Sequence, residues 1–190
     1  MKNNVDEKIG VIHGRFQCLH KGHLEYLLAG AKRCDRLIVG ITNFDVQEEK
    51  PYNEANPKRA NKESNPLSYY HRYMMVKNSL IEAGLDQSKF DVVPFPIEFP
   101  EKIFNYVPKD ATFFVTIYDK WGEKKLKILE DLGVQVDVMW RRTDADRLTS
   151  GTEVRKLIKE GGAWEHLVPP AVAKYLVENN LLDVVKGDNK

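Results

Sequence analysis

Two histidines, an arginine and two glycines are gathered in the segment GRFQCLHKGH near the start of the chain. The guanidinium of Arg15 offers a planar fork of N–H donors that fits phosphate oxygens. His20 and His23 can donate to the same oxygens, and imidazole changes its charge near neutral pH. Gly14 and Gly22 allow the backbone to approach a ligand without an intervening side chain. Residues of these types at this spacing indicate a phosphate-binding site.

A second cluster of polar residues lies far downstream, in the segment SGTEVR. Ser150 and Glu153 match a capping box, which predicts a helix over residues 152–160 and would by itself account for the motif. Arg155, however, lies one turn into that helix, where a cation opposes the helix dipole. A bound polyanion would favour a cation at this place. We therefore expect Arg155 and the hydroxyl groups of Ser150 and Thr152 to contact phosphate.

The pattern of apolar residues predicts where the first segment lies. Residues 9–12 form an apolar run long enough for one buried strand, and leucines recur at helical spacing from Leu24 onward. In such a strand-turn-helix unit, the N–H groups at the helix start and the positive end of its dipole face the carboxyl end of the strand. This geometry is well suited to binding phosphate.

Strands and helices are predicted to alternate through most of the chain. The further predicted strands cover residues 36–42, 90–95, 112–117 and 134–140, and the further predicted helices cover residues 66–83, 103–107, 122–132 and 169–180. This order predicts an α/β fold with a doubly wound parallel sheet of about five strands and flanking helices. Because the carboxyl ends of parallel strands meet at one edge, the polar segments are expected to form one site.

One domain is expected over residues 1–190. Residues 46–65 form a long polar segment without apolar periodicity, which predicts an insertion or a lid whose lysines and arginine could reach a triphosphate. Residues 184–190 are expected to form a frayed polar tail. Arg72 falls outside the apolar stripe of its predicted helix and is a further candidate for contact with substrate phosphate.

The two polar segments together resemble the signatures of the His-x-Gly-His nucleotidyltransferase superfamily, and within it those of the archaeal-type nicotinamide-nucleotide adenylyltransferases. The resemblance rests on GRFQ at residues 14–17, HKGH at residues 20–23 and SGTEVR at residues 150–155. Cys18 stands where the family usually has proline, and Thr149 where it usually has isoleucine, but neither change removes a phosphate donor.

The resemblance implies a Rossmann-like fold and a transfer reaction without a protein nucleophile. A substrate phosphate would attack the α-phosphorus of ATP and release pyrophosphate, with the rate coming from alignment and from cationic donors. His20, His23 and Arg155 are implied as catalytic residues. Mg²⁺ is expected to accompany ATP, without a dedicated metal site on the protein. The residues implied to bind nucleotide or phosphate are Gly14, Arg15, Phe16, Gly22, Trp140, Ser150 and Thr152.

Aromatic and amide side chains that follow the other predicted strands are candidates to bind the acceptor, the substrate whose phosphate attacks ATP. In the archaeal-type family, an asparagine and an aromatic residue hold the nicotinamide ring, and Asn105-Tyr106 resembles that pair, with packing in the core as the alternative. Flat rings also stack on bases. The residues predicted to bind the acceptor are Thr42, Asn43, Asn105, Tyr106, Tyr118 and Trp121.

The amino-acid composition limits the kinds of molecule that the protein is expected to bind. The formal net charge is +1 with 30% charged and 42% hydrophobic residues, which argues against a nucleic-acid-binding protein. No apolar run has the length of a membrane span, and the first residues lack the core of a signal peptide. Cys18 and Cys34 lack metal or redox spacing. We expect a cytoplasmic protein with small-molecule substrates and without nucleic-acid or membrane partners, and the family suggests a homo-oligomer.

Three functions agree with these observations. The favoured one is adenylyl transfer from ATP to nicotinamide mononucleotide, which yields NAD. The second is cytidylyl or adenylyl transfer to another small phosphorylated acceptor, such as a phosphorylated alcohol. The third is a nucleotide sensor without turnover, which the presence of His20, His23 and Arg155 together disfavours.

Overall fold

The computed structural model describes residues 7–44 and 62–187, and its centre is a parallel β-sheet. The strands are β1 (Ile9–Gly14), β2 (Arg36–Ile41), β3 (Phe90–Pro94), β4 (Thr112–Ile117) and β5 (Gln135–Arg141). Within the described residues they pair in the order β3-β2-β1-β4-β5, and every pair is parallel. The predicted doubly wound parallel sheet is confirmed.

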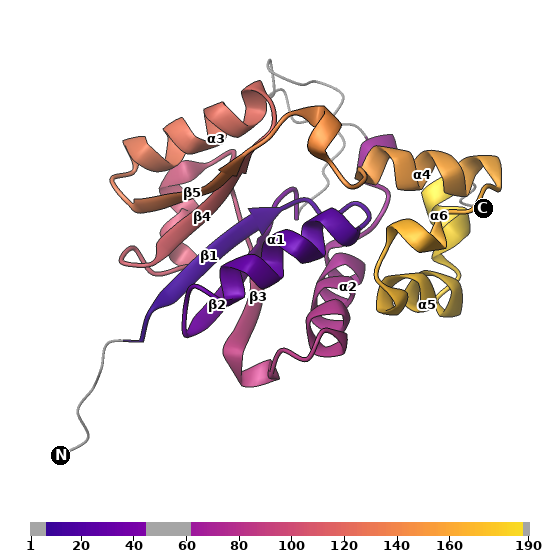
Figure 1. The fold of residues 1–190 in the computed structure, drawn as a ribbon, viewed down its shortest axis with the longest axis horizontal. Helices are drawn as coiled ribbons and strands as arrows, with labels where there is room; N and C mark the ends of the chain where they lie inside the picture. Colours follow the sequence, from indigo (N-terminus) through magenta and orange to yellow (C-terminus); the bar gives the residue numbers. More distant parts are fainter. Residues whose placement is uncertain (1–6, 45–61, 188–190) are drawn as a thin grey trace.

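Helices connect the strands and continue beyond the sheet (Figure 1). The α-helices are α1 (Lys21–Ala31), α2 (Tyr69–Glu82), α3 (Lys120–Asp131), α4 (Gly151–Glu160), α5 (Pro170–Glu178) and α6 (Leu181–Lys186). Short 3-10 helices are η2 (Lys62–Ser64), η3 (Gln87–Lys89), η4 (Pro100–Asn105), η5 (Asp144–Asp146) and η6 (Glu165–Leu167).

Several boundaries differ from the sequence-based prediction; the helix predicted over residues 103–107, for example, is the 3-10 helix η4 over Pro100–Asn105. Helix α2 begins at Tyr69 rather than near residue 66, because the Ser68 hydroxyl caps it by accepting from the N–H of His71. The frayed tail predicted from residue 184 is wrong for its first part, since α6 extends to Lys186 and buries Val185. Val184 and Val185 pack in or against the core, and this burial outweighs the polar composition of the rest of the segment.

Each face of the sheet carries its own hydrophobic core. On one face, Ile12 of β1 packs with Leu27 of α1 and Met75 of α2, and this core continues into α4, α5 and α6. On the other face, Phe113 of β4 packs with Leu129 of α3 and with residues around η4. Alternate residues of β1 point to opposite cores, as the pleat of a strand requires.

The centre of the sheet opens at the carboxyl end of β1. Strand β1 pairs with β2 along its whole length, but with β4 only at Gly10 and Val11. Beyond these pairs the carbonyl of Phe114 in β4 accepts instead from the hydroxyl of Tyr26 in α1. Because the strand order reverses between β1 and β4, this is the place where open α/β sheets bind ligands.

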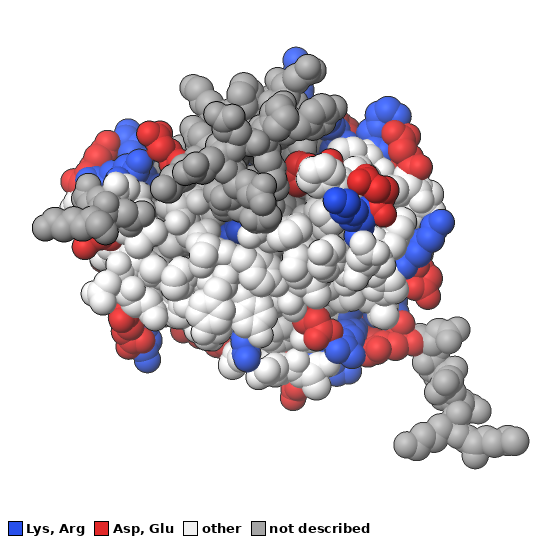
Figure 2. Space-filling view, turned by 180° about the vertical axis from the view of Figure 1, so that it is seen from behind, with Lys and Arg blue, Asp and Glu red and all other residues white. Residues whose placement is uncertain are grey.

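The surface carries charges of both signs. In the face shown in Figure 2, Lys and Arg side chains alternate with Asp and Glu side chains around the margin, and uncharged surface lies between them. This distribution agrees with the near-neutral formal charge of the chain. None of the described helices combines the length and hydropathy needed to cross a bilayer.

Candidate functional site

The start of α1 is built from two histidines that cap each other. His20 is the N-cap residue, and its Nδ1 accepts from the backbone N–H of His23 at 3.3 Å. In return, Nδ1 of His23 accepts from the backbone N–H of His20 at 3.3 Å, and the two rings stack with centroids 3.7 Å apart. Since Nδ1 accepts in both rings, Nε2 carries the ring proton and is the donor available to a ligand.

Both imidazoles are neutral at physiological pH. Burial lowers the pKa of His20 to about 4. The pKa of His23 also lies well below its ordinary value, first because of burial, then because of the adjacent His20, and then because of cationic neighbours, among them Arg15. The buried ring of Phe16 packs edge-on against His23 at 5.0 Å and fixes its orientation. The pair is therefore a rigid, neutral donor set at a helix N-terminus.

The low pKa of His20 makes the stability of the fold depend on pH. Between pH 6.5 and about pH 4, His20 binds a proton in the unfolded chain but not in the folded one, so acid favours unfolding. This difference in proton binding should lower the free energy of unfolding by up to about 3 kcal/mol by pH 4. His20→Asn retains an N-cap and removes the titrating ring, so we expect a smaller loss of stability between about pH 7 and about pH 5. Urea unfolding of both proteins at the two pH values tests this, and equal losses would contradict it.

Helix α4 brings the second polar segment against the first. Arg155 is 7% exposed, and its guanidinium donates to the backbone carbonyl of Gln17 and, at 3.4 Å, to the hydroxyl of Thr152. Gly151 is required here, because a Cβ at this position would lie 2.4 Å from the carbonyl oxygen of Gln17. The two segments recognised in the sequence, far apart along the chain, are therefore in direct contact.

The cap of α4 is simpler than predicted. The Ser150 hydroxyl accepts from the N–H of Glu153 at 3.1 Å, but the Glu153 carboxylate accepts from the hydroxyl of Thr149 at 2.9 Å. The predicted reciprocal half of the capping box is therefore wrong. Thr149 competes successfully for the carboxylate, because its hydroxyl is a nearby donor.

Arg72 is not a phosphate contact, and that prediction is wrong. Its side chain is fully buried, and its guanidinium donates to the carbonyls of Arg15 and Thr42 at 3.0 and 2.7 Å, of Asn43 at 2.7 Å and of Ser68 at 3.3 Å. Burial lowers the pKa of Arg72 to about 10. This cation ties together the loops that follow β1 and β2.

The other predicted phosphate contacts lie around the histidine pair. Gly14 ends β1, and Gly22 lies in the first turn of α1. The Arg15 guanidinium donates to the side-chain carbonyl of Asn65 at 3.4 Å. Gln17 exchanges two hydrogen bonds with the backbone of Leu67, at 2.9 and 3.0 Å, which holds the loop in place. Most of the predicted 46–65 insertion, residues 46–61, lies outside the described residues.

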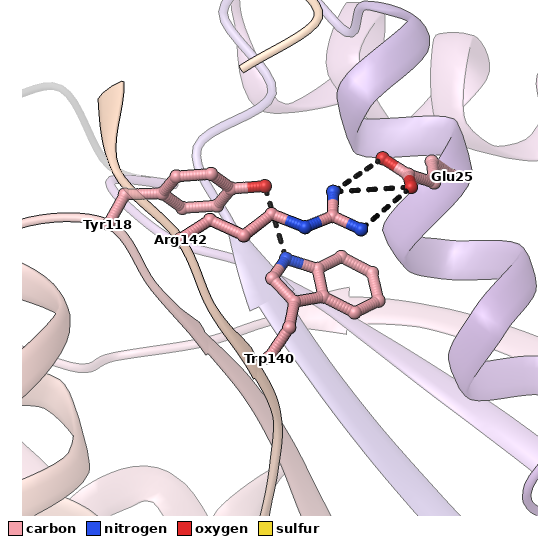
Figure 3. A network of polar contacts seen from close by, with 4 residues as sticks. All are labelled: Glu25, Tyr118, Trp140 and Arg142. Carbon is pink, nitrogen blue, oxygen red and sulfur yellow. Dashed lines mark hydrogen bonds and ion pairs between the residues drawn. The ribbon is translucent and has the colours of Figure 1, made fainter. Parts of the chain in front are cut away.

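A network of four residues occupies the carboxyl ends of β4 and β5 (Figure 3). The indole N–H of Trp140 donates to the hydroxyl of Tyr118 at 3.1 Å. The guanidinium of Arg142 lies 4.3 Å above the Trp140 ring and pairs with both oxygens of Glu25 at 3.2 Å. Sequence reasoning assigned neither Glu25 nor Arg142, since only the fold brings α1 and the end of β5 together.

An open depression of about 420 Å³ lies beside this network. It is lined by Ile117, Tyr118, Asp119, Lys120, Glu123, Arg141, Arg142, Thr143 and Asp146. Its lining contains carboxylates, guanidinium groups and the aromatic residue Tyr118. Such a surface offers both donors and acceptors to a flat polar ligand.

The residues predicted to bind the acceptor divide into two groups. Tyr106, at the end of η4, lies 6.1 Å from the ring of Phe44 after β2, so that region gathers Thr42, Asn43, Asn105 and Tyr106. Tyr118 and Trp121 instead lie at the end of β4 and the start of α3, with Tyr118 in the Trp140 network. The two groups lie on different sides of β1 in the strand order.

Known proteins share this sequence pattern. A sequence profile described as cytidylyltransferase-like matches residues 11–157. The chain is 54% identical over 172 residues to a phosphonoformate cytidylyltransferase of Streptomyces viridochromogenes, covering 89% of this chain and 90% of the relative. It is 26% identical to a nicotinamide-nucleotide adenylyltransferase of Saccharolobus solfataricus, covering 95% and 93%. The predicted resemblance to the nucleotidyltransferase superfamily is thus confirmed, but the archaeal-type adenylyltransferase is the more distant of these two relatives.

Solved structures agree on the fold. A bifunctional NMN adenylyltransferase/ADP ribose pyrophosphatase of Francisella tularensis superposes with a TM-score of 0.65 at 18% identity. The match covers 95% of this chain and 52% of that one, so the chain spans about half the length of that protein. A putative nicotinate-nucleotide adenylyltransferase of Vibrio parahaemolyticus gives a TM-score of 0.58 at 18% identity, covering 93% and 95%. The Rossmann-like nucleotidyltransferase fold is confirmed.

Proposed function

The chain belongs to the cytidylyltransferase-like family of nucleotidyltransferases, and from this premise we propose that it transfers CMP from CTP to phosphonoformate. The observation that carries the proposal is the 54% identity with a phosphonoformate cytidylyltransferase along about nine-tenths of both chains. The identity with the nicotinamide-nucleotide adenylyltransferases is about half as high. This favours cytidylyl transfer to a small acceptor over the formation of NAD.

In the proposed reaction, a phosphonate oxygen of the acceptor attacks the α-phosphorus of CTP. The new P–O bond forms as the bond to the bridging oxygen breaks, and the electron pair leaves with pyrophosphate. We assign the Nε2–H groups of His20 and His23 to the oxygens of the α-phosphate. Neutral, prepositioned donors stabilise the charge that grows there without reorganising during the reaction.

The β- and γ-phosphates would lie between the two polar segments. In our proposal, Arg15 and the hydroxyls of Ser150 and Thr152 donate to them, together with Arg155 after it exchanges the Gln17 carbonyl for phosphate oxygen. We expect Mg²⁺ to enter with CTP, since phosphate oxygens and water suit this hard cation. The cytosine would occupy the depression beside Trp140 and Tyr118. The polar groups that line this depression can form hydrogen bonds with the amino group and the ring acceptors of the base.

Pyrophosphate release from pairs of nucleotide and acceptor tests this function. CTP and ATP are each incubated with Mg²⁺ and either phosphonoformate or nicotinamide mononucleotide. We expect release with CTP and phosphonoformate, and a product whose mass equals CMP joined to the acceptor. Release only with ATP and nicotinamide mononucleotide would instead establish the adenylyltransferase function. Nucleotide binding without release from any pair would support a sensor.

A further inference from the structure

His13 is a buried polar side chain that the reaction described above does not use. It is 3% exposed, and neither of its ring nitrogens has a hydrogen-bond partner among the described residues. A buried donor without a partner costs about 1–3 kcal/mol, so such groups commonly await a ligand or water. The sequence did not indicate a role for His13, because this residue directly follows the apolar residues of β1.

The fold holds this imidazole in a defined orientation. Its ring stacks on Phe95 with centroids 4.7 Å apart and planes inclined by 9°. Gly40 lies opposite His13 in β2 and makes room for this stack, since a Cβ there would lie 2.6 Å from the Phe95 ring. An apolar residue would satisfy the same packing, so packing alone does not account for an imidazole.

His13 also lies where the sheet opens. The pairing between β1 and β4 ends at Val11, two residues before His13. On the α1 side of the sheet, the hydroxyl of Tyr26 occupies this gap by donating to the carbonyl of Phe114. His13 belongs to the opposite side, with Phe95, and it is one residue from the Gly14–Arg15 turn that leads to the histidine pair.

A cationic side chain acts on this place. The ammonium of Lys125, in the second turn of α3, acts on both His13 and His23 and lowers the pKa of each, after the larger effect of burial. Lys125 therefore lies close enough to influence the reacting centre and His13 together. The His13 imidazole is neutral, and in this form it has one N–H that can donate to an anionic oxygen.

We propose that His13 binds the carboxylate of the acceptor, while the phosphonate of the same molecule faces His23 and the α-phosphorus. This inference rests on the proposed function and makes it more specific, because it requires an acceptor with two anionic groups on neighbouring atoms. In phosphonoformate a single C–P bond joins the two groups, so their binding sites must be adjacent. His13 directly precedes the Gly14–Arg15 turn at the end of β1, and this is our reason for placing the two binding sites side by side.

The test compares two acceptors in two proteins. With CTP, the wild-type enzyme should have a KM for phosphonoformate at least tenfold below that for methylphosphonate, which lacks the carboxylate. His13→Phe keeps a ring against Phe95 and removes the donor, so it should raise the KM for phosphonoformate at least tenfold, the scale of one hydrogen bond to a charged group. The KM for methylphosphonate and the KM for CTP should change less than about twofold, within the ordinary scatter of a substitution that leaves those contacts intact.

His13→Gln serves as the matched control, because its amide offers an N–H of similar reach, and it should recover part of the lost affinity. Equal increases for the two acceptors, or an increase in the KM for CTP, would mean that His13 only supports the fold and would overturn the inference. So would an unchanged KM for phosphonoformate.

If the wild-type enzyme releases no pyrophosphate with CTP and phosphonoformate, the proposed function fails separately. Calorimetric titration of phosphonoformate into the wild type and into His13→Phe then decides about His13 itself. Binding that disappears in the variant would support the anion site. Binding that persists, or that is absent from the wild type, would refute it.

Discussion

Replacing His23 by alanine is expected to lower kcat for pyrophosphate release at least a hundredfold, with the fold intact. In our proposal the Nε2–H of His23 donates to the α-phosphate as its charge increases, and the loss of one such donor typically costs a factor of 10² to 10³. The ring is fixed by Phe16 and by the hydrogen bond from the N–H of His20, so its donor is held in place before the substrates bind. Steady-state pyrophosphate release at saturating CTP and acceptor measures the effect.

The control must separate catalysis from capping, because Nδ1 of His23 also caps α1. Glutamine at this position of a helix can accept from the N-cap N–H in the same way, so His23→Gln should unfold at the same urea concentration as the wild type. We expect His23→Gln to lose nearly as much kcat as His23→Ala. Recovery of activity in the glutamine variant would mean that helix capping or an amide donor suffices in place of the imidazole, and full activity in both variants would remove His23 from the site.

The parts of the site that local patterns define could be predicted from the sequence. The strand-turn-helix at residues 9–31 and the helix start at Ser150 each follow from a few neighbouring residues, and both are present. The contact between these segments, through Arg155 and the Gln17 carbonyl, agrees with the expected parallel order of strands. Helical spacing likewise placed α3 correctly, since Leu126 and Leu129 pack in the core.

The parts that depend on contacts distant in the chain could not be predicted. Helical spacing places Arg72 outside the apolar stripe, and only the fold brings the carbonyls of Arg15 and Thr42 to it. His13 was concealed in the same way by its apolar neighbours. The sequence did not identify the nucleotide or the acceptor for another reason. An adenylyltransferase and a cytidylyltransferase need the same phosphate-binding residues, so these residues do not distinguish the two. The base and acceptor contacts, such as those near Trp140, come from strand ends that carry no common motif.

Replacing Arg72 by alanine is expected to produce the largest loss of stability among the substitutions considered. The guanidinium is fully buried and donates to four backbone carbonyls, and its removal would leave acceptors without a partner beside a cavity. We expect a loss of roughly 3–5 kcal/mol in the free energy of unfolding, which corresponds to a decrease in Tm of roughly 10 °C for a chain of this size. Urea and thermal unfolding measure these quantities.

Arg72→Lys separates the charge from the geometry. A lysine retains the cation but offers a compact ammonium instead of a planar fork, so it cannot reach carbonyls on both loops at once. We expect it to recover only part of the stability and to show a lower kcat/KM, because the turn after Gly14 and the end of β2 lose their common anchor. Arg33→Ala is the matched control, since Arg33 pairs with Asp137 on the surface, where such pairs contribute about 0–1 kcal/mol. If Arg72→Lys matched the wild type in both stability and kcat/KM, the buried charge alone would suffice, and the fork of hydrogen bonds would not be what holds the two loops in register.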